Sequence, residues 1–161
     1  MDDIRNNVNQ TQNLLACQLN VSGLSSHSKI GVERFVLNRK VNILALQETR
    51  VAELESNCFS NMKTFLNPCG HGVALAVSSF LKPGLVPDLI DSTVPVLWVS
   101  AEIDRKAILL CSAYSSPEVS GTQSLDEVLK SIDKAKAYGT RYGIKSLLIL
   151  GDFNARSPMW G

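Results

Sequence analysis

Side chains able to bind metal or donate hydrogen bonds follow four short apolar segments, where each segment ends: Asn20, Glu48, Tyr114, and the pair Asp152 and Asn154. Carboxylate and amide oxygens are the hard ligands that Mg²⁺ and Mn²⁺ prefer, commonly together with water and a substrate phosphate. Asparagine and tyrosine side chains also donate hydrogen bonds to phosphate oxygens. The sequence contains no GxxxxGK[ST] phosphate loop. These residues therefore favour metal-assisted hydrolysis of a phosphate ester over nucleotide-dependent transfer.

Such chemistry requires the five side chains to meet, and short apolar runs predict the strands that would bring them together. The runs are continuous rather than alternating, which indicates strands covered on both faces. Ligands of sheets with parallel strands bind outside the carboxyl ends of those strands. We therefore expect the polar residues to converge on one rim. The predicted strands are Leu14–Leu19, Asn42–Leu46, Val73–Val77, Val96–Ile103, Ala107–Ala113 and Leu147–Leu150.

Two segments between the predicted strands have the apolar spacing of helices. The first covers about Gly31 to Arg39, with Ser28 as its N-cap. The second begins near Leu125 and is expected to end at Gly139 or Gly143. The chain therefore alternates strands and helices at both of its ends, with consecutive strands between them.

This order of elements predicts a mixed sheet in the α/β (α+β mixed-sheet) class. The first strand–helix–strand unit implies a right-handed crossover and parallel pairing. The polar turn Asp104-Arg105-Lys106 joins two apolar runs and predicts an antiparallel hairpin.

The composition is that of a chain that can bury a core. Hydrophobic residues make up 45% and charged residues 19% of the 161 residues. The net charge of +1 excludes a globally basic nucleic-acid binder but leaves a local basic patch open. No apolar run approaches the roughly 18 residues of a membrane span. Residues 1–13 form a polar leader, expected to be disordered, without the apolar centre of a signal peptide. We expect an intracellular protein, nuclear or cytoplasmic.

The cysteines and histidines give little indication of a site of their own. The four cysteines form no CxxC pair, which argues against structural zinc, and disulfides are not expected in a reducing compartment. His27 and His71 stand alone in the sequence and are interpreted as loop and turn residues.

Several stretches carry a family resemblance. The chain from residue 14 onward resembles the endonuclease/exonuclease/phosphatase superfamily, whose fold is DNase I-like. Within it, the chain looks most like the endonuclease domain of non-LTR (LINE-type) retrotransposons. The supporting stretches are LNVSGL (19–24), NILALQET (42–49), GHGVALAV (70–77), SAYSSP (112–117) and LILGDFNARSPMWG (148–161).

The resemblance implies a four-layer αββα sandwich and a role for each residue at the strand ends. Glu48 would be the principal ligand of Mg²⁺ or Mn²⁺, assisted by Asn20. Asp152 would orient and help activate the attacking water. Asn154 would bind the scissile phosphate, and Tyr114 would contact it. The implied reaction is metal-dependent hydrolysis of a DNA phosphodiester, with DNA as substrate and no membrane partner.

Two arginines closely follow the two main motifs. Arg50 comes after Gln-Glu-Thr, and Arg156 comes after Gly-Asp-Phe-Asn-Ala. They are expected to contact backbone phosphates near the cut. Such contacts position DNA without reading its sequence.

One departure from the family pattern bears on activity. The family carries a further Asp and then a Ser-Asp-His motif, and this sequence contains no Ser-Asp-His. Residues 14–161 are therefore interpreted as a partial domain that lacks its C-terminal part. The isolated chain is expected to be a weak nuclease or inactive. Much of the second sheet is expected to be missing, which would leave an apolar face uncovered and favour self-association.

Two alternatives stay open from the sequence. One is a non-catalytic remnant of the same domain. The other is a phosphoesterase that acts on inositol or lipid phosphates, against which the SPMWG stretch (157–161) argues because it resembles the retroelement form.

Overall fold

The computed structural model describes residues 13–116 and 125–154, so of the predicted polar leader only Asn13 is included. These residues form two four-stranded sheets. The first has the order β1-β2-β4-β3, with β1 Ala16–Asn20, β2 Ile43–Gln47, β3 Met62–Asn67 and β4 Val73–Ser78. The second has the order β5-β6-β7-β8, with β5 Gly84–Leu85, β6 Val96–Ile103, β7 Lys106–Tyr114 and β8 Ser146–Asp152.

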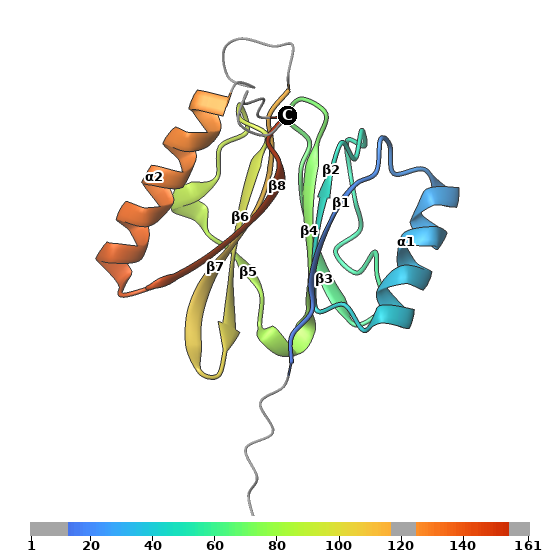
Figure 1. Ribbon diagram of the computed structural model, residues 1–161, viewed down its shortest axis with the longest axis horizontal. Coiled ribbons are helices and arrows are strands. Elements are labelled where there is room, and N and C mark those ends of the chain that lie inside the picture. Colours follow the sequence, from blue (N-terminus) through green and yellow to red (C-terminus); the bar gives the residue numbers. More distant parts are fainter. Residues whose placement is uncertain (1–12, 117–124, 155–161) are drawn as a thin grey trace, which may run out of the picture.

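Two α-helices cover the outer faces of the sheets, which gives four layers (Figure 1). Helix α1, Ser26–Arg39, lies outside the first sheet, and α2, Leu125–Tyr142, lies outside the second. Short 3₁₀ helices follow β4 and β5, η1 at Ser79–Leu81 and η2 at Pro87–Leu89. The predicted αββα architecture and mixed α/β class are confirmed. Within the described ranges, no helix is both long enough and apolar enough to span a membrane.

Parallel pairing occurs once in each sheet and sets the position of the rim. β1 pairs with β2 through α1, and β7 pairs with β8 through α2; the remaining neighbours are antiparallel. The predicted parallel first unit and the β6–β7 hairpin are therefore confirmed. The carboxyl ends of β1, β2 and β8 all lie at the top in Figure 1.

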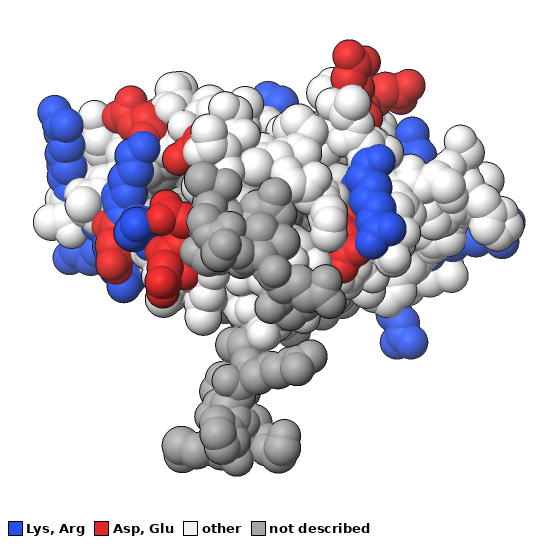
Figure 2. All heavy atoms as spheres, turned by 90° about the horizontal axis from the view of Figure 1, so that it is seen from above, with Lys and Arg blue, Asp and Glu red and all other residues white. Residues whose placement is uncertain are grey.

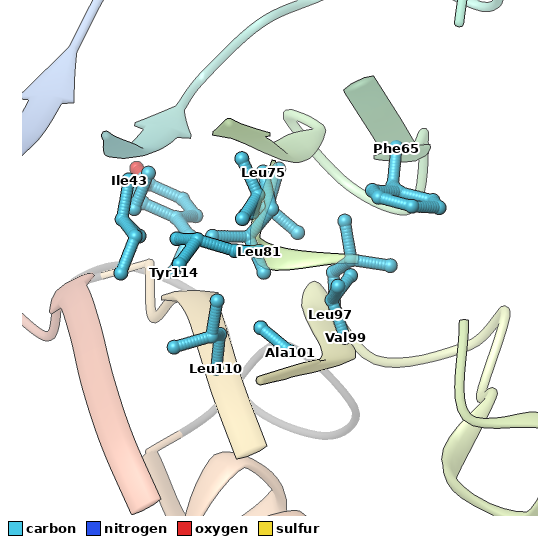
Figure 3. Packing of buried hydrophobic residues seen from close by; sticks show 12 residues of the cluster. Ile43, Phe65, Leu75, Leu81, Leu97, Val99, Ala101, Leu110 and Tyr114 are labelled. Carbon is cyan, nitrogen blue, oxygen red and sulfur yellow. The ribbon is translucent and has the colours of Figure 1, made fainter. Parts of the chain in front are cut away.

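The main core lies between the two sheets. Ile43 and Leu75 of the first sheet face Val99 and Leu110 of the second, and all four are almost completely buried (Figure 3). Every residue of β2 and β4 is buried, because the other sheet covers one face of these strands and the α1 layer covers the other. This double covering explains their uninterrupted apolar sequences.

Helix α1 begins earlier than the sequence predicted. Its N-cap is Ser25, whose hydroxyl oxygen accepts a hydrogen bond from the Ser28 backbone N–H at 3.2 Å. The predicted start at Gly31 and the predicted cap at Ser28 are therefore wrong. The first turn is polar and lies partly in solvent, so it contributes no apolar spacing from which its helical state could be predicted.

Helix α2 ends at Tyr142, and Gly143 follows with a φ of +73°. This left-handed residue is the predicted glycine stop. Gly139, the other predicted stop, lies inside the helix, where a Cβ atom would lie 2.6 Å from the Ile144 carbonyl oxygen. Glycine is therefore needed at position 139 because Ile144 approaches the helix closely there, and not because the helix ends there.

Two strands were not predicted from the sequence. β3 contains exposed Lys63 and buried Thr64, which interrupt its apolar character. It forms because Phe65 and its neighbours pair with the fully buried β4 in antiparallel register. β5 is only two residues long and forms because it pairs with β6.

The second sheet has four strands in the described residues, and its edge strand β8 has apolar neighbours on both faces. The inner side chains of β8, such as Leu148, pack toward the inter-sheet core, and outer ones, such as Ile149, pack toward the cluster that contains α2 residues. The expectation that much of the second sheet is missing, with an apolar face left uncovered, stays a prediction. The edge strand β8 is only partly buried from Leu147 to Asp152.

Candidate active site

One asparagine joins the two sheets at the rim. Asn20, at the end of β1, donates hydrogen bonds from Nδ2 to Glu48 Oε1 at 2.9 Å and to Asp152 Oδ2 at 3.0 Å. Its own Oδ1 accepts a bond from the Ser22 N–H at 3.1 Å, which fixes the orientation of the amide. The predicted residues Asn20, Glu48 and Asp152 therefore meet, although they come from both sheets.

The loop that carries Glu48 is fixed by the loop before β4. Thr49 N–H donates to the Gly72 carbonyl at 3.1 Å, and Arg50 N–H donates to the His71 carbonyl at 2.9 Å. Both Glu48 and Arg50 have a φ of +52°. Residues other than glycine adopt this conformation at a cost of about 1–3 kcal/mol, and such strain concentrates at functional sites. The two backbone bonds explain how the strained loop is held.

Gly72 permits this close approach. Its φ is +78°, and a Cβ atom at this position would lie 2.4 Å from the hydroxyl oxygen of Thr49. A side chain at position 72 would therefore push the Glu48 loop away from β4.

The carboxylate of Glu48 is held in its ionised form. Asn20 donates to one of its oxygens, and Arg50 forms an ion pair with the other, Oε2. The hydrogen bond from Asn20 lowers the pKa of Glu48 most, burial opposes this, and Arg50 lowers the pKa further. An ionised and partly dehydrated carboxylate is suited to binding a hard cation.

Tyr114, at the end of β7, lies beneath this carboxylate cluster. It is buried, and its ring centroid is 5.5 Å from that of His71. Burial raises the pKa of the Tyr114 phenol, and the neighbouring charges of Glu48 and Asp152 raise the pKa further. The phenol is therefore protonated at neutral pH and is a hydrogen-bond donor.

The end of β8 is tied to the end of β7. The Ser115 N–H donates to the carbonyl of Asp152 at 2.9 Å, and Asn154 Nδ2 donates to the carbonyl of Ser115 at 2.9 Å. Asn154 has a φ of +44°, and its N–H donates to Asp152 Oδ1 at 3.3 Å. These bonds position Asp152 and Asn154 beside Tyr114. Arg156, the last predicted site residue, lies outside the described residues.

A buried polar network behind Glu48 was missed from the sequence. Gln47 is fully buried, donates to Ser112 Oγ at 3.1 Å, and accepts from Gln18 Nε2 at 2.7 Å. Ser112 in turn donates to the carbonyl of Leu46 at 3.1 Å. The network connects β1 and β2 with β7 directly beneath the rim. The available signal was a glutamine that ends an otherwise apolar strand sequence.

His71 was interpreted as a turn residue, and it does lie in the loop before β4. The structure adds that its Nδ1 is 4.0 Å from Glu48 Oε2. The antiparallel pairing of β2 and β4 explains this, because the start of β4 must then lie at the end of β2.

The donor set fits a hard divalent cation. Two carboxylates, those of Glu48 and Asp152, are linked through one amide, and Mg²⁺ sites commonly combine one or two carboxylates with several waters. Among the described residues, no group of three or more His, Cys, Asp or Glu side chains is arranged so that it could hold a metal ion. The amide of Asn20 presents nitrogen rather than oxygen to the carboxylates, so here it positions them.

Charged side chains around the rim are mixed in sign. On the face seen in Figure 2, Lys and Arg side chains lie near Asp and Glu side chains, with uncharged surface between these groups. The described part of this face therefore carries no single continuous basic band.

Comparison with known proteins supports the fold. No family model and no curated protein matches the sequence, whereas solved structures do match. The endonuclease domain of TRAS1, a telomere-specific non-LTR retrotransposon, is 24% identical with a TM-score of 0.61, over 89% of this chain and 62% of that one. TDP2 of D. rerio, complexed with single strand DNA product, is 15% identical with a TM-score of 0.64, over 87% and 60%.

An AP endonuclease from Archaeoglobus fulgidus is 18% identical with a TM-score of 0.56, over 91% of this chain and 60% of that one. This chain therefore spans about three fifths of the length of these three proteins. It has the DNase I-like fold, as its sequence motifs predicted.

Proposed function

We propose that this chain is a metal-dependent phosphodiesterase domain that acts on DNA, of the kind found in the endonucleases of non-LTR retrotransposons. The observation that carries the proposal is the hydrogen-bonded cluster in which Asn20 links Glu48 to Asp152 at the rim of both sheets. The structures of similar fold are a retrotransposon endonuclease domain, an AP endonuclease, and TDP2 with a DNA product. These names favour DNA over inositol or lipid phosphates as the substrate class.

Glu48 would hold Mg²⁺ or Mn²⁺, with Asp152 close enough to act beside it. When bound, the metal supplies positive charge to a phosphate oxygen and lowers the pKa of bound water. Asp152 would orient and help activate the attacking water, since its carboxylate lies at the rim and is held there by hydrogen bonds from Asn20 and Asn154. The amide of Asn20 fixes the positions of the two carboxylates and reduces the repulsion between them.

Asn154 and Tyr114 serve the phosphate. The phenol of Tyr114 stays protonated because burial and two nearby carboxylates raise its pKa, so it can donate to a phosphate oxygen. The side-chain amide of Asn154 already donates to a carbonyl oxygen, that of Ser115, and the residue is exposed at the rim. Preorganised donors of this kind stabilise charge that develops on the phosphate during reaction.

We further propose that the isolated 161-residue polypeptide is a weak nuclease or inactive. Its sequence has no Ser-Asp-His, and loss of one member of an acid–base set commonly lowers rate by orders of magnitude. The direct assay is nicking of supercoiled plasmid with Mg²⁺, beside the Glu48→Ala variant. Little or no nicking above that variant is expected. Robust nicking by the wild-type chain that Glu48→Ala abolishes would contradict the proposed weakness but support the phosphodiesterase function.

The same assay distinguishes the substrate classes. Each protein is also incubated with an inositol polyphosphate, and released phosphate is measured. If phosphate is released from the inositol polyphosphate only when Glu48 is present, and DNA is not nicked, the substrate is a small phosphate ester and not DNA. Failure of the polypeptide to bind any divalent metal at Glu48 would favour a non-catalytic remnant.

A further inference from the structure

Arg50 occupies an unusual position for a residue expected to contact substrate. Its backbone is in the left-handed conformation, with a φ of +52°, and is held there by the bond from its N–H to the His71 carbonyl. From this fixed backbone the guanidinium group reaches back to Glu48 Oε2, although about half of the side chain, 51%, remains exposed. The arginine is therefore paired with the carboxylate two residues before it.

The two oxygens of Glu48 have different surroundings. Oε1 accepts from the neutral amide of Asn20. Oε2 faces nitrogen-bearing side chains, with Arg50 in an ion pair and His71 Nδ1 at 4.0 Å. A divalent cation on Glu48 would meet the guanidinium group at this carboxylate, and two cations that share one carboxylate repel each other.

We propose that Arg50 exchanges with the metal at Glu48: it neutralises the carboxylate while no metal is bound, and metal binding releases it to contact a DNA phosphate. This inference rests on the proposed function, because it takes Glu48 as the metal ligand. It assigns Arg50 a positioning role in which metal and phosphate binding are coupled through one mobile side chain. The coupling is reciprocal, so bound phosphate also favours the metal.

Half-exposed ion pairs are weak, and this sets the size of the effect. An exposed pair contributes little, so its removal changes an affinity by about two- to five-fold. Arg50→Gln should therefore bind Mn²⁺ about two- to five-fold more tightly than wild type, measured as free Mn²⁺ by electron paramagnetic resonance without DNA. Arg50→Lys keeps the positive charge and should lie between the two. Arg105→Gln, in the β6–β7 turn at the opposite end of the sandwich (Figure 1), is the matched control and should equal wild type.

The second measurement is the affinity for a fluorescein-labelled DNA duplex. Addition of Mn²⁺ should strengthen DNA binding more in wild type than in Arg50→Gln. Circular dichroism of each variant verifies folding, and Arg50→Lys keeps the test valid should Arg50→Gln fold poorly.

The outcomes separate this inference from the proposed function. Glu48→Gln should lose most Mn²⁺ affinity. If it does, the metal site is supported, and two results for Arg50→Gln would still refute the exchange. One is a Mn²⁺ affinity no higher than that of wild type. The other is an increase in DNA affinity on addition of Mn²⁺ that equals the increase in wild type. If Glu48→Gln binds Mn²⁺ as wild type does, the metal site and the exchange both fail.

Discussion

Asn20 and Asp152 are 132 positions apart along the chain, yet the amide nitrogen of Asn20 lies 3.0 Å from a carboxylate oxygen of Asp152. The first residue ends β1 of one sheet and the second ends β8 of the other. Their contact, with Glu48 as the third member, brings the two sheets together at one rim. The site therefore depends on correct packing of both sheets and not on any local segment.

Loss of the Asn20 amide should change how stability depends on pH. The pKa of Glu48 is below its ordinary value mainly because Asn20 donates to it. The resulting stability is fully present above the unfolded pKa, near 4.5, and is lost as the pH falls through the lower folded value. Asn20→Ala should lower the free energy of unfolding by about 1–3 kcal/mol at pH 7.

Urea unfolding of both proteins from pH 7 down to pH ~3 measures this effect, in a range set by the ordinary carboxyl pKa. The difference between wild type and Asn20→Ala should shrink as the pH falls below 4.5. A difference that stays constant with pH would show that the hydrogen bond to Glu48 is not what the substitution removes.

Gly72 should tolerate no side chain. A Cβ atom there would lie 2.4 Å from Thr49 Oγ1, and the positive φ adds strain. Gly72→Ala should lower the free energy of unfolding by about 1–3 kcal/mol and loosen the Glu48 loop. Gly31→Ala, in α1 with no atom within 4 Å of its Cβ position, is the matched control.

The control should stabilise the protein slightly, by about 0.4–1 kcal/mol, because alanine is the better helix former. Chemical denaturation of both variants decides the matter. Equal changes in the free energy of unfolding for Gly72→Ala and Gly31→Ala would contradict the close contact between Gly72 and the Glu48 loop.

The buried network around Gln47 should be cooperative. Gln47→Leu removes the hydrogen bond that buried Ser112 Oγ accepts, although Ser112 keeps its bond to the Leu46 carbonyl. A buried polar group that loses a partner costs about 1–3 kcal/mol. Adding Ser112→Ala to Gln47→Leu should cost less than Ser112→Ala does alone. A double-mutant cycle by urea denaturation measures the coupling. Strict additivity of the two substitutions would show that the inter-sheet bond contributes nothing to stability.

Much of the fold could be predicted from short apolar runs. Val73 to Val77 is buried throughout and was predicted as a strand. A strand that is buried on both faces needs apolar residues at successive positions, and this continuous run is visible in the sequence. β3 was missed because Lys63 is exposed and Thr64 is polar, so its strand character comes from pairing with β4. The first turn of α1 was also missed, because it is polar and has no apolar residues at helical spacing.

The site was predictable in its members but not in its contacts. Strand ends identified Glu48 and Asp152, and the structure brings both to Asn20. The ion pair of Arg50 with Glu48 and the approach of His71 depend on left-handed backbone and on antiparallel pairing. Neither feature can be predicted from the local sequence. The sequence therefore could not show whether Arg50 contacts substrate or forms an ion pair with Glu48.

The partly exposed β8 should favour self-association. It pairs with β7 in parallel, and its side chains from Leu147 onward are only partly buried. Exposed strand edges and apolar patches promote association. Sedimentation velocity should show a larger species that grows with concentration, together with binding of a hydrophobic dye. A monodisperse monomer that binds no dye would contradict this expectation.

In the proposed function, Glu48 holds a divalent metal at the rim and Asp152 lies beside it. The most direct measurement is a crystal structure of the chain grown with MnCl₂, with anomalous scattering recorded to locate manganese. We predict an anomalous peak at coordination distance from the Glu48 carboxylate and next to Asp152, with the Arg50 guanidinium turned away from Glu48. Absence of a peak there in crystals saturated with Mn²⁺, or a peak only elsewhere on the molecule, would contradict the assignment of Glu48 as the metal ligand.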